Sequence, residues 1–463
     1  MCEANRTCPN QSYTPSLEGT CSEGYTGNLC QTCAINYHRV SKIWCTTCPS
    51  YSSSLALSTC YALAVLCFSV LIVVTSIKSA RKPKSLSSVY LKLFMNYLQL
   101  VMLMGSFNLS WPTLTKEMLN IQDSAGSFSE HLFTTDCLTD DFDENEAFFT
   151  KLVLLSAAPI IFFIFSSLCC LVIAAVKKSV SVLRNELVAS GIILFFLLHP
   201  SVMRVMFGAF SCEEVKPGEY WVSGLLVRCW EGRHLTFALT LALPAIVIWG
   251  VGLPGVILGS IVRHRKKLRD ISVKIRYGFL IKGYADSRYY WEFIIIYRKL
   301  LIIGIATFLS RIAKMTQALI ALSVLVLSLV LQHHYKPYSH LSLNSMEQRS
   351  ILVSIATIFF GLYFLDGSLS AGLQNFFFAV ILGANLYFLQ FWLRKTMVAC
   401  FVMAVKRISW LHDRFVVISE TSAVSNKTFI KRFKSHSEIS RIALTRLLPS
   451  TAKDTYLQKL RRQ

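Results

Sequence analysis

Charged residues are scarce in this chain, and acidic residues are scarcer still. Only 16% of the 463 residues are charged, with 26 Asp and Glu against 47 Lys and Arg, while 53% are hydrophobic and the mean hydropathy is +0.48. Soluble globular chains carry closer to about 25% charged residues. The shortage argues against an ordinary soluble protein, and the sequence predicts an all-α polytopic membrane protein.

Short motifs that mark common enzyme classes are also missing. The sequence contains no G-x4-G-K-[ST] phosphate loop, no H-E-x-x-H zinc helix and no G-x-S-x-G nucleophile elbow. We therefore expect no enzyme activity, no catalytic residues, no cofactor and no bound metal.

Long apolar runs are what the chain has instead. A membrane-spanning helix needs about 17 to 25 apolar residues, and nine runs approach that length: 54–77, 88–109, 149–176, 187–209, 234–261, 290–310, 314–333, 349–366 and 371–393. A count of eight stays open, because the sixth run contains charges and the eighth is short. We expect a helix bundle over residues 54–393, a small extracellular module over 1–50 and a cytoplasmic tail over 394–463.

Basic residues predict the orientation of this bundle. With the N-terminus outside, the inner loops hold about 18 Lys and Arg and the outer loops about 6, as the positive-inside rule requires. Because the basic residues flank apolar runs, they predict no nucleic-acid groove. The expected location is the plasma membrane, with an extracellular N-terminus and a cytoplasmic C-terminus.

Glycosylation sequons and the first residues of the chain give further information on the orientation in the membrane. Asn5, Asn10 and Asn108 are glycosylation candidates on the outer side, whereas a fourth sequon at Asn426 falls inside and is expected to be idle. No signal peptide opens the sequence. Either the first span acts as a reverse signal-anchor, or the chain is the C-terminal part of a longer protein, which we favour.

Cysteines cluster ahead of the first span, within "CSEGYTGNLCQTCAINYHRVSKIWCTTC". Paired C-x-x-C motifs can bind zinc, but the outer side and the Gly-Tyr-Thr-Gly turn favour a disulfide-stapled, EGF-like module. It would contact an extracellular ligand or matrix, or serve as a rigid spacer. The outer disulfide candidates are Cys21, Cys30, Cys33, Cys45, Cys48, Cys137, Cys212 and Cys229. We expect Cys212 to pair with Cys229, which leaves Cys137 to join the module.

The second outer segment, residues 110–148, is strongly acidic. It contains nine Asp and Glu against one Lys. Its "DFDENE" stretch lacks the Gly and the final Glu of a calcium-binding EF-hand loop. Two interpretations stay open: a vestibule that attracts cations, and a solvated loop without a binding role.

Charges interrupt the sixth run, "YYWEFIIIYRKLLIIG". A charged side chain at the centre of a span costs roughly 2.5 to 3.5 kcal/mol, so Glu292, Arg298 and Lys299 need partners. Glu292 and Lys299 lie on one helical face, and we expect them to pair, whereas Arg298 points elsewhere. The stripe is either a gating element or an anchor that fixes helix depth.

The fourth and fifth runs carry further candidates. "LLHPSVMR" places the titratable His199 and Arg204 beside Pro200, and "LALPAIVIWGVGLPGVILGS" combines Pro244 and Pro254 with four glycines. The prolines are candidate hinges, and close packing is the alternative. Four polar residues are expected to hydrogen bond between helices: Asn96, Gln99, Gln317 and Asn385.

The tail is basic and partly amphipathic. It carries 15 Lys and Arg against four acidic residues. Such segments bind anionic inner-leaflet lipids or calmodulin-like partners. The lipid-binding candidates are Lys406, Arg407, Arg414, Lys431, Arg432 and Lys434.

Several stretches resemble known families. "NYLQLVMLMGSFNLSWP", "HPSVMRVMFGAFSC", "YGFLIKGYADSRYYWEFIIIYRKLL" and "LNSMEQRSILVS" resemble the C-terminal membrane region of ciliate and other protist surface proteins with EGF-like or growth-factor-receptor-like cysteine repeats. Over about 290–350, the E-x5-R-K helix and the "KPY…N" loop are also similar to the TRP-like, polycystin-related fungal family. The resemblance implies a multi-spanning membrane protein of the cation-channel type. We expect a TRP-like, calcium-permeable channel, with a homo-oligomer as one assembly to test. The alternatives are a non-conducting receptor or adhesion protein and a lipid or small-molecule transporter.

Overall fold

The computed structural model describes residues 21–421, apart from gaps at 27–31, 35–36, 40–44, 81–85, 108, 127–143, 177–182, 216–217, 222–223, 269, 310–312 and 366–368. The chain divides into two compact units, Met1–Lys395 and Thr396–Gln463. Some predicted sites therefore lie outside the described residues: Asn5, Asn10, Cys30, Asn108, Cys137, Lys431, Arg432 and Lys434.

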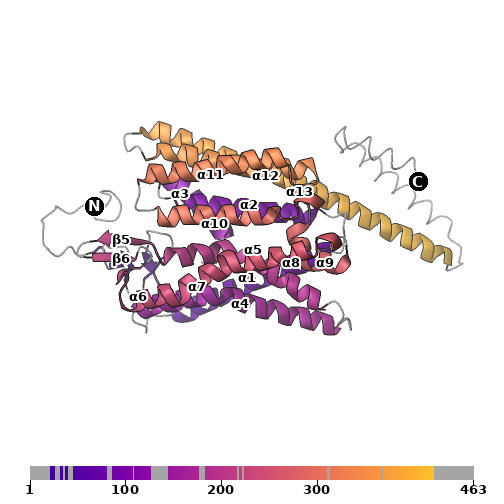
Figure 1. Ribbon diagram of the computed structural model, residues 1–463, viewed down its shortest axis with the longest axis horizontal. Coiled ribbons are helices and arrows are strands. Elements are labelled where there is room, and N and C mark those ends of the chain that lie inside the picture. The colour runs from indigo at the N-terminus through magenta and orange to yellow at the C-terminus, as the bar shows by residue number, and fades with distance from the viewer. Residues whose placement is uncertain are drawn as a thin grey trace. The chain divides into compact units, whose positions relative to one another are not determined.

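Helices make up most of the described chain (Figure 1). They are α1 (Tyr51–Ala80), α2 (Ser87–Gly105), α3 (Thr113–Gly126), α4 (Glu144–Val176), α5 (Leu183–Gly208), α9 (Ile271–Ile281), α10 (Trp291–Phe308), α11 (Lys314–Tyr335), α12 (Leu341–Tyr363) and α13 (Ala371–Thr421). Between α5 and α9 runs one composite helix, made of α6 (Gly232–Phe237), α7 (Leu243–Ala245) and α8 (Leu253–Arg263) joined by π-helical turns at Ala238–Ala242 and Ile246–Gly252. Short 3-10 turns cover Arg265–Lys267 and Asp286–Arg288.

The helices agree with the predicted apolar runs, since each of the nine runs lies mostly in a helix. Within the described residues, five helical segments are long and apolar enough to cross a membrane: Ala62–Ser79, Arg184–Gly208, Gly232–Arg263, Lys314–Tyr335 and Ala371–Phe401. A shorter apolar stretch, Ser156–Val172, lies in α4. Helices α2, α10 and α12 fall below this threshold because polar and charged residues interrupt them. The count of nine spans therefore stays a prediction.

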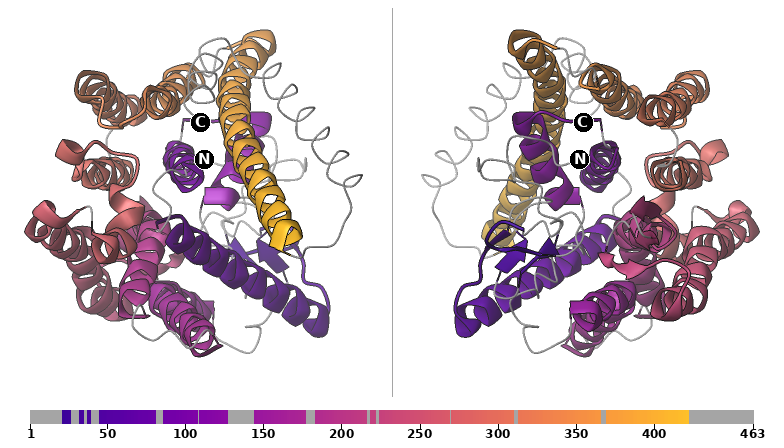
Figure 2. Two further views of the ribbon diagram at one scale, coloured as in Figure 1. Left: turned by 90° about the vertical axis from the view of Figure 1, so that its right-hand side faces the viewer. Right: turned by 90° about the vertical axis from the view of Figure 1, so that its left-hand side faces the viewer.

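Helix α5 forms the centre of the bundle. Within its candidate span 78% of the residues are buried, against 17% for the composite helix α6–α8 and 22% for α13. α5 packs against α1, α4, α9 and α10, while α2 packs against α10 and α12. Figure 2 looks along the length of the bundle. The composite helix leaves apolar side chains such as Val247, Val251 and Val256 exposed, as expected for a surface that faces lipid.

Two helices have no counterpart in the sequence analysis. Helix α3 forms at the start of the acidic segment, and α9 forms in the basic segment between the fifth and sixth runs. α9 buries Val273, Ile275 and Tyr277. Arg276 of α9 donates a hydrogen bond to Asn185, near the first turn of α5. Helix α9 therefore closes the N-terminal end of α5.

Cysteine pairing supports the predicted cysteine-rich module. Strand β1 (Tyr25–Thr26) pairs with β2 (Thr32–Cys33), and β3 (Tyr37–Arg39) pairs with β4 (Cys45–Thr47). A disulfide joins Cys33 to Cys45, and Cys21 and Cys48 are also disulfide-bonded. For these four cysteines the disulfide interpretation is confirmed over the zinc interpretation.

A three-stranded sheet covers the other end of α5. Its antiparallel strands are β5 (Cys212–Val215), β6 (Gly218–Trp221) and β7 (Gly224–Arg228). The predicted disulfide between Cys212 and Cys229 is confirmed. Just beyond it, the buried His234 accepts a hydrogen bond from the Trp230 amide at Nδ1, 3.0 Å, and donates one from Nε2 to the Ala209 carbonyl, 3.0 Å. The sheet is thereby fixed to the end of α5.

The predicted hinge prolines lie within continuous helices. α5 continues through Pro200, and the composite helix continues through Pro244 and Pro254. In a π-helix the N–H of residue i bonds the carbonyl of residue i−5, so the Trp249 carbonyl would take its bond from residue 254. Because proline has no N–H, that carbonyl is left for another donor. The hinge role of these prolines stays a prediction.

Candidate functional site

Every fully buried Lys, Arg or Glu side chain in the described part of the chain belongs to one cluster. We call it the charge cluster, and its members are Lys92 of α2, Glu292, Arg298 and Lys299 of α10, and Glu347 of α12. Each is at most 8% exposed. An ion moved into a protein interior loses roughly several kcal/mol of hydration free energy. Burying the cluster is therefore costly, and its contacts show how that cost is offset.

Glu292 is the acceptor at the centre of the cluster. Its Oε2 lies 2.6 Å from Lys92 Nζ and accepts a hydrogen bond from the Tyr284 hydroxyl at 2.9 Å. Its Oε1 lies 3.5 Å from Asn96 Nδ2. Lys92 Nζ also donates to the Phe279 and Leu280 carbonyls at 3.1 and 3.3 Å. The last turn of α9 thus holds the partner of Glu292 in place.

Lys299 has amide partners in place of a carboxylate. Its Nζ donates hydrogen bonds of 2.6 Å to both Asn96 Oδ1 and Gln99 Oε1, and it lies 4.9 Å from the centre of the Phe196 ring. The expected ion pair between Glu292 and Lys299 is therefore wrong. Sequence spacing put both on one face of α10, but Lys92 on the neighbouring helix reaches the carboxylate and Asn96 stands between the two.

Arg298 points to a different helix, as its position in the sequence predicts. Its Nη2 lies 3.1 Å from Glu347 Oε1 on α12. Three buried atoms here have no hydrogen-bond partner among the described residues: Arg298 Nε, Glu347 Oε2 and Ser350 Oγ. Glu347 and Ser350 are three positions apart and share a helical face. This second pair is incompletely satisfied, which makes it easier to disturb than the first.

A tyrosine pair closes the end of the cluster next to α9. Tyr284 and Tyr338 stack at 4.5 Å between ring centres, with their hydroxyls 3.1 Å apart. The backbone supports them, because Asn344 Nδ2 donates to the Tyr338 carbonyl at 2.7 Å. Burial raises the pKa of both hydroxyls well above the ordinary value, and the nearby carboxylates Glu292 and Glu347 raise the pKa further. Both tyrosines therefore remain neutral donors.

Charge counting shows an imbalance in the charge cluster. It contains three cations and two carboxylates, and each carboxylate has one cation in direct contact. Lys299 is the cation left over. Replacing buried ion pairs with apolar side chains is often neutral or stabilising, so packing alone does not require these residues.

His199 lies beside the charge cluster on α5. The side chain is 1% exposed, it is close enough to Lys299 for their charges to interact, and it hydrogen bonds to the Trp249 carbonyl that Pro254 leaves without a backbone donor. Its Nε2 has no partner among the described residues. Arg204, the other candidate on this helix, is half-buried and lies further along toward the sheet.

Sequence reasoning missed Lys92 and Glu347, although a signal for each exists. Lys92, Asn96 and Gln99 follow each other at four- and three-residue spacing, so they form one polar face of α2. On α12, polar residues recur on one buried face: Asn344, Glu347, Ser350, Ser354 and Thr357. Polar residues at helical spacing inside an apolar helix point toward the bundle interior.

The remaining interhelical candidates have partners in the structure. Gln99 Nε2 donates to the Leu197 carbonyl of α5 at 3.1 Å, and Gln317 Nε2 donates to the Ala306 carbonyl of α10 at 2.8 Å. Asn385 accepts a hydrogen bond from the Tyr97 hydroxyl of α2. Of the tail candidates, Lys406, Arg407 and Arg414 fall within α13.

A cluster of metal-binding residue types occurs at the sheet end of α5. It consists of Cys212, Cys229 and His234. The two sulfurs form a disulfide, and both ring nitrogens of the histidine already hydrogen bond. This arrangement serves to hold the sheet and leaves no ligand atom for a metal.

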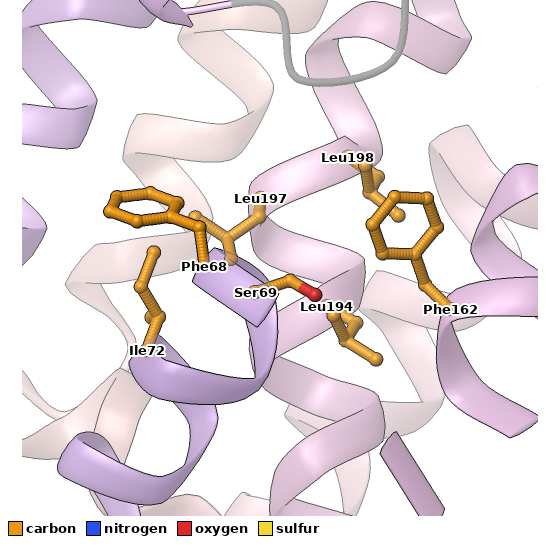
Figure 3. Close-up of a pocket in the computed structure, with 7 residues that line it drawn as sticks. All are labelled: Phe68, Ser69, Ile72, Phe162, Leu194, Leu197 and Leu198. Carbon is orange, nitrogen blue, oxygen red and sulfur yellow. The ribbon is translucent and has the colours of Figure 1, made fainter. Parts of the chain in front are cut away.

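An apolar cavity lies between α1, α4 and α5 (Figure 3). The space inside it is small, about 10 Å³, which is roughly enough for one water molecule. The lining residues are Phe68, Ser69, Ile72, Phe162, Leu194, Leu197 and Leu198. The Ser69 hydroxyl donates to the Leu66 carbonyl of its own helix at 2.8 Å. The lining of the cavity is therefore apolar.

Comparison with known proteins gives a distant relative. The chain is similar to "Cysteine repeat modular protein A" from Toxoplasma gondii, with 22% identity over an alignment 430 residues long. The alignment covers 76% of this chain. The chain spans only 14% of that protein's length. No family model matches the chain, and no solved structure matches it. The match fits the disulfide-bonded, cysteine-rich module.

Proposed function

We propose that this chain is an ion-conducting membrane protein of the cation-channel type, in which α10 is the gating helix. The observation that carries the proposal is the charge cluster, which binds α10 to α2 through Glu292 and to α12 through Arg298. Ionisable residues inside a helix bundle usually serve a path or a switch, because the bilayer makes them expensive.

The arrangement favours a closed gate over a selectivity filter. The charge cluster has one cation in excess, so it would repel cations that passed directly along it. Breaking the Arg298–Glu347 pair would free α10 from α12 while the first pair still holds the helix to α2. We propose that opening begins at this second pair, and that the channel conducts calcium among other cations.

A matched pair of variants tests the gate. Glu347→Gln keeps the shape of the side chain but removes its charge, and Gln348→Glu adds a charge at the neighbouring half-buried position, outside the charge cluster. In planar bilayers we expect Glu347→Gln to raise the open probability by about tenfold, which corresponds to a loss of about 1.4 kcal/mol from the closed state. The control should match the wild type. Folded wild-type protein that passes no current under voltage, tension or calcium would contradict the proposal.

The topology is a proposal too, with the N-terminus outside the plasma membrane and the C-terminus in the cytoplasm. The disulfides at the head and at the sheet support it, because disulfides persist on the outer side. Glycosylation at Asn5, Asn10 or Asn108 in intact cells would support it. Cleavage of the tail by protease added outside sealed cells would contradict it.

A second candidate function is that of a non-conducting surface receptor or adhesion protein. The disulfide-bonded module and the similarity to a cysteine repeat protein favour it. Deleting residues 1–50 separates the two. Loss of cell-surface binding with intact current supports a channel with a modular head, while binding without any current in the full chain supports the receptor.

A third candidate is a lipid or small-molecule transporter, favoured by the apolar cavity. An acyl chain found between α1 and α4 in the purified protein would support it. Leu197→Trp fills the cavity, and it should abolish lipid transfer if this function is correct and leave ion currents unchanged if it is not.

A further inference from the structure

Lys299 combines deep burial with a hydrogen-bond set that does not require its charge. Its two partners are the side-chain oxygens of Asn96 and Gln99 at 2.6 Å. A neutral amine still has two N–H groups, so it can keep both bonds, and the charged form has one further N–H. Protonation of Lys299 therefore changes the charge of the cluster without breaking the bonds that position the side chain.

The same residue is the cation that the charge cluster contains in excess. With all five groups ionised the cluster carries one net positive charge, and with Lys299 neutral it carries none. Because separated charges interact strongly in a low-dielectric interior, the two protonation states differ substantially in how firmly α10 is held. A single proton is thus able to alter the electrostatic balance of the gate.

His199 supplies an acceptor beside this lysine. Phe196, whose ring lies under Lys299 Nζ, and His199 are three positions apart and share a face of α5. Since His199 donates to the Trp249 carbonyl through one ring nitrogen, the other, Nε2, carries a lone pair. That lone pair has no donor among the described residues. The charged Lys299, whose third N–H is not used by Asn96 or Gln99, and the buried His199 acceptor without a donor therefore lie in the same part of the bundle.

We infer that Lys299 and His199 form one proton-binding site at the centre of the bundle, and that H⁺ is its ligand. When the proton leaves Lys299, the N–H bond breaks, the electron pair stays on Nζ, and a new N–H bond forms on His199 Nε2 or on water. Double protonation is unfavourable because both groups are buried with like charge. The inference deepens the proposed function by naming the ion that governs α10.

Other charged and titratable groups around Lys299 belong to the same electrostatic environment. They are Lys92 on α2, Glu292 and Arg298 on α10, Glu347 on α12, and the two tyrosines, Tyr284 and Tyr338, next to α9. The carboxylates each contact another cation, and the tyrosines donate or stack. Lys299 and His199 are thus the pair without an ionic partner of their own.

Two substitutions lock the site in opposite states. Lys299→Met is permanently neutral, and Lys299→Arg is permanently charged because guanidinium does not deprotonate in proteins. His199→Gln removes the second proton position but keeps the lysine. Lys314→Met, at the exposed start of α11, is the matched control.

Melting temperatures of the full chain in nanodiscs, from about pH 5 to about pH 10, test proton binding without any need for transport. We expect the wild type and the Lys314→Met control to share a pH-dependent component that is missing from both locked variants and reduced in His199→Gln. If Lys299→Met fails to fold, the melting profile of Lys299→Arg alone tests whether Lys299 binds the proton. A Lys299→Arg profile that matches the wild type overturns the inference.

Currents separate this inference from the proposed function. We expect the wild-type open probability to change with pH by at least about tenfold, and each locked variant to stay at one of the two extremes. Currents in Lys299→Arg that keep the wild-type pH response overturn the proton site but leave the channel proposal standing. If no variant conducts, the channel proposal fails, and the melting curves still decide whether the site binds a proton.

Discussion

The two ends of the bundle are held together by different chemistry. At one end, the disulfide between Cys212 and Cys229 and the hydrogen bonds of His234 fix the sheet to α5. At the other end and toward the middle, ion pairs and amides join α10 to its neighbours. The strength of a disulfide or of a hydrogen bond between neutral groups changes little when a nearby side chain gains or loses a proton. The strength of an ion pair in a low-dielectric interior changes strongly. Among the described residues, the contacts of α10 therefore depend on charge more than the contacts that hold the sheet to α5.

The largest effect is expected at Glu292. Glu292→Gln leaves Lys92 buried without its ionic partner, so we expect a loss of roughly 3 to 5 kcal/mol of folding free energy. Adding Lys92→Met should restore most of it, whereas adding Lys299→Met should restore less. Denaturant unfolding in detergent micelles measures all four proteins. Equal recovery by the two double variants would contradict the assignment of Lys92 as the partner.

Loss of the disulfide at the opposite end should have a smaller and pH-independent effect. Cys212→Ser with Cys229→Ser removes a crosslink across 17 residues of sequence separation, so we expect a loss of about 3 kcal/mol. Gating should keep its dependence on pH because the charge cluster is untouched. A double variant that folds normally but no longer responds to pH would show that the two ends are coupled.

A substitution at Gly283 tests how much the backbone conformation next to Tyr284 contributes to stability. Its φ is +95°, and a Cβ there would lie 2.8 Å from Val89 Cγ1. We expect Gly283→Ala to cost about 1 to 3 kcal/mol through strain and contact. Adding Val89→Ala should relieve the contact but not the strain, so thermal unfolding should show partial recovery. Full recovery would mean that the positive φ costs little here.

The smallest effect is expected at Lys282, at the end of α9. Its Nζ donates to the Ser79 carbonyl at 2.6 Å, and burial lowers its pKa from 10.5 to about 8. The unfolded chain therefore binds more protons between these values, so stability rises with pH from about 8 to about 10.5. Because the side chain is only half-buried, we expect no more than about 1 kcal/mol. Lys282→Met should lack the rise in melting temperature, and an unchanged rise would contradict the assignment.

Much of the fold could be predicted from the sequence because hydrophobic runs and cysteines act locally. The nine apolar runs are helical, and the Cys212–Cys229 pair follows from two cysteines sharing one loop. Helix α9 was missed because its apolar face is short and its segment reads as a basic loop. The number of spans could not be derived, since polar residues in α2, α10 and α12 lower their hydropathy without exposing them.

The candidate site was predicted only in part, for a physical reason. Glu292, Arg298 and Lys299 stand out because charges are costly in an apolar run. Their partners depend on which helices are neighbours, and helical spacing within α10 carries no information on that. Lys92 is inconspicuous near the start of an apolar run, and Glu347 lies two residues before the predicted run 349–366.

One measurement tests the central claim that the buried charges serve gating and not stability. Arg298→Met combined with Glu347→Met replaces the second ion pair with apolar side chains of similar length. In paired planar-bilayer recordings and melting curves, we predict a double variant as stable as the wild type whose current no longer closes. A stable double variant with wild-type gating, or no current from either folded protein, would contradict the account.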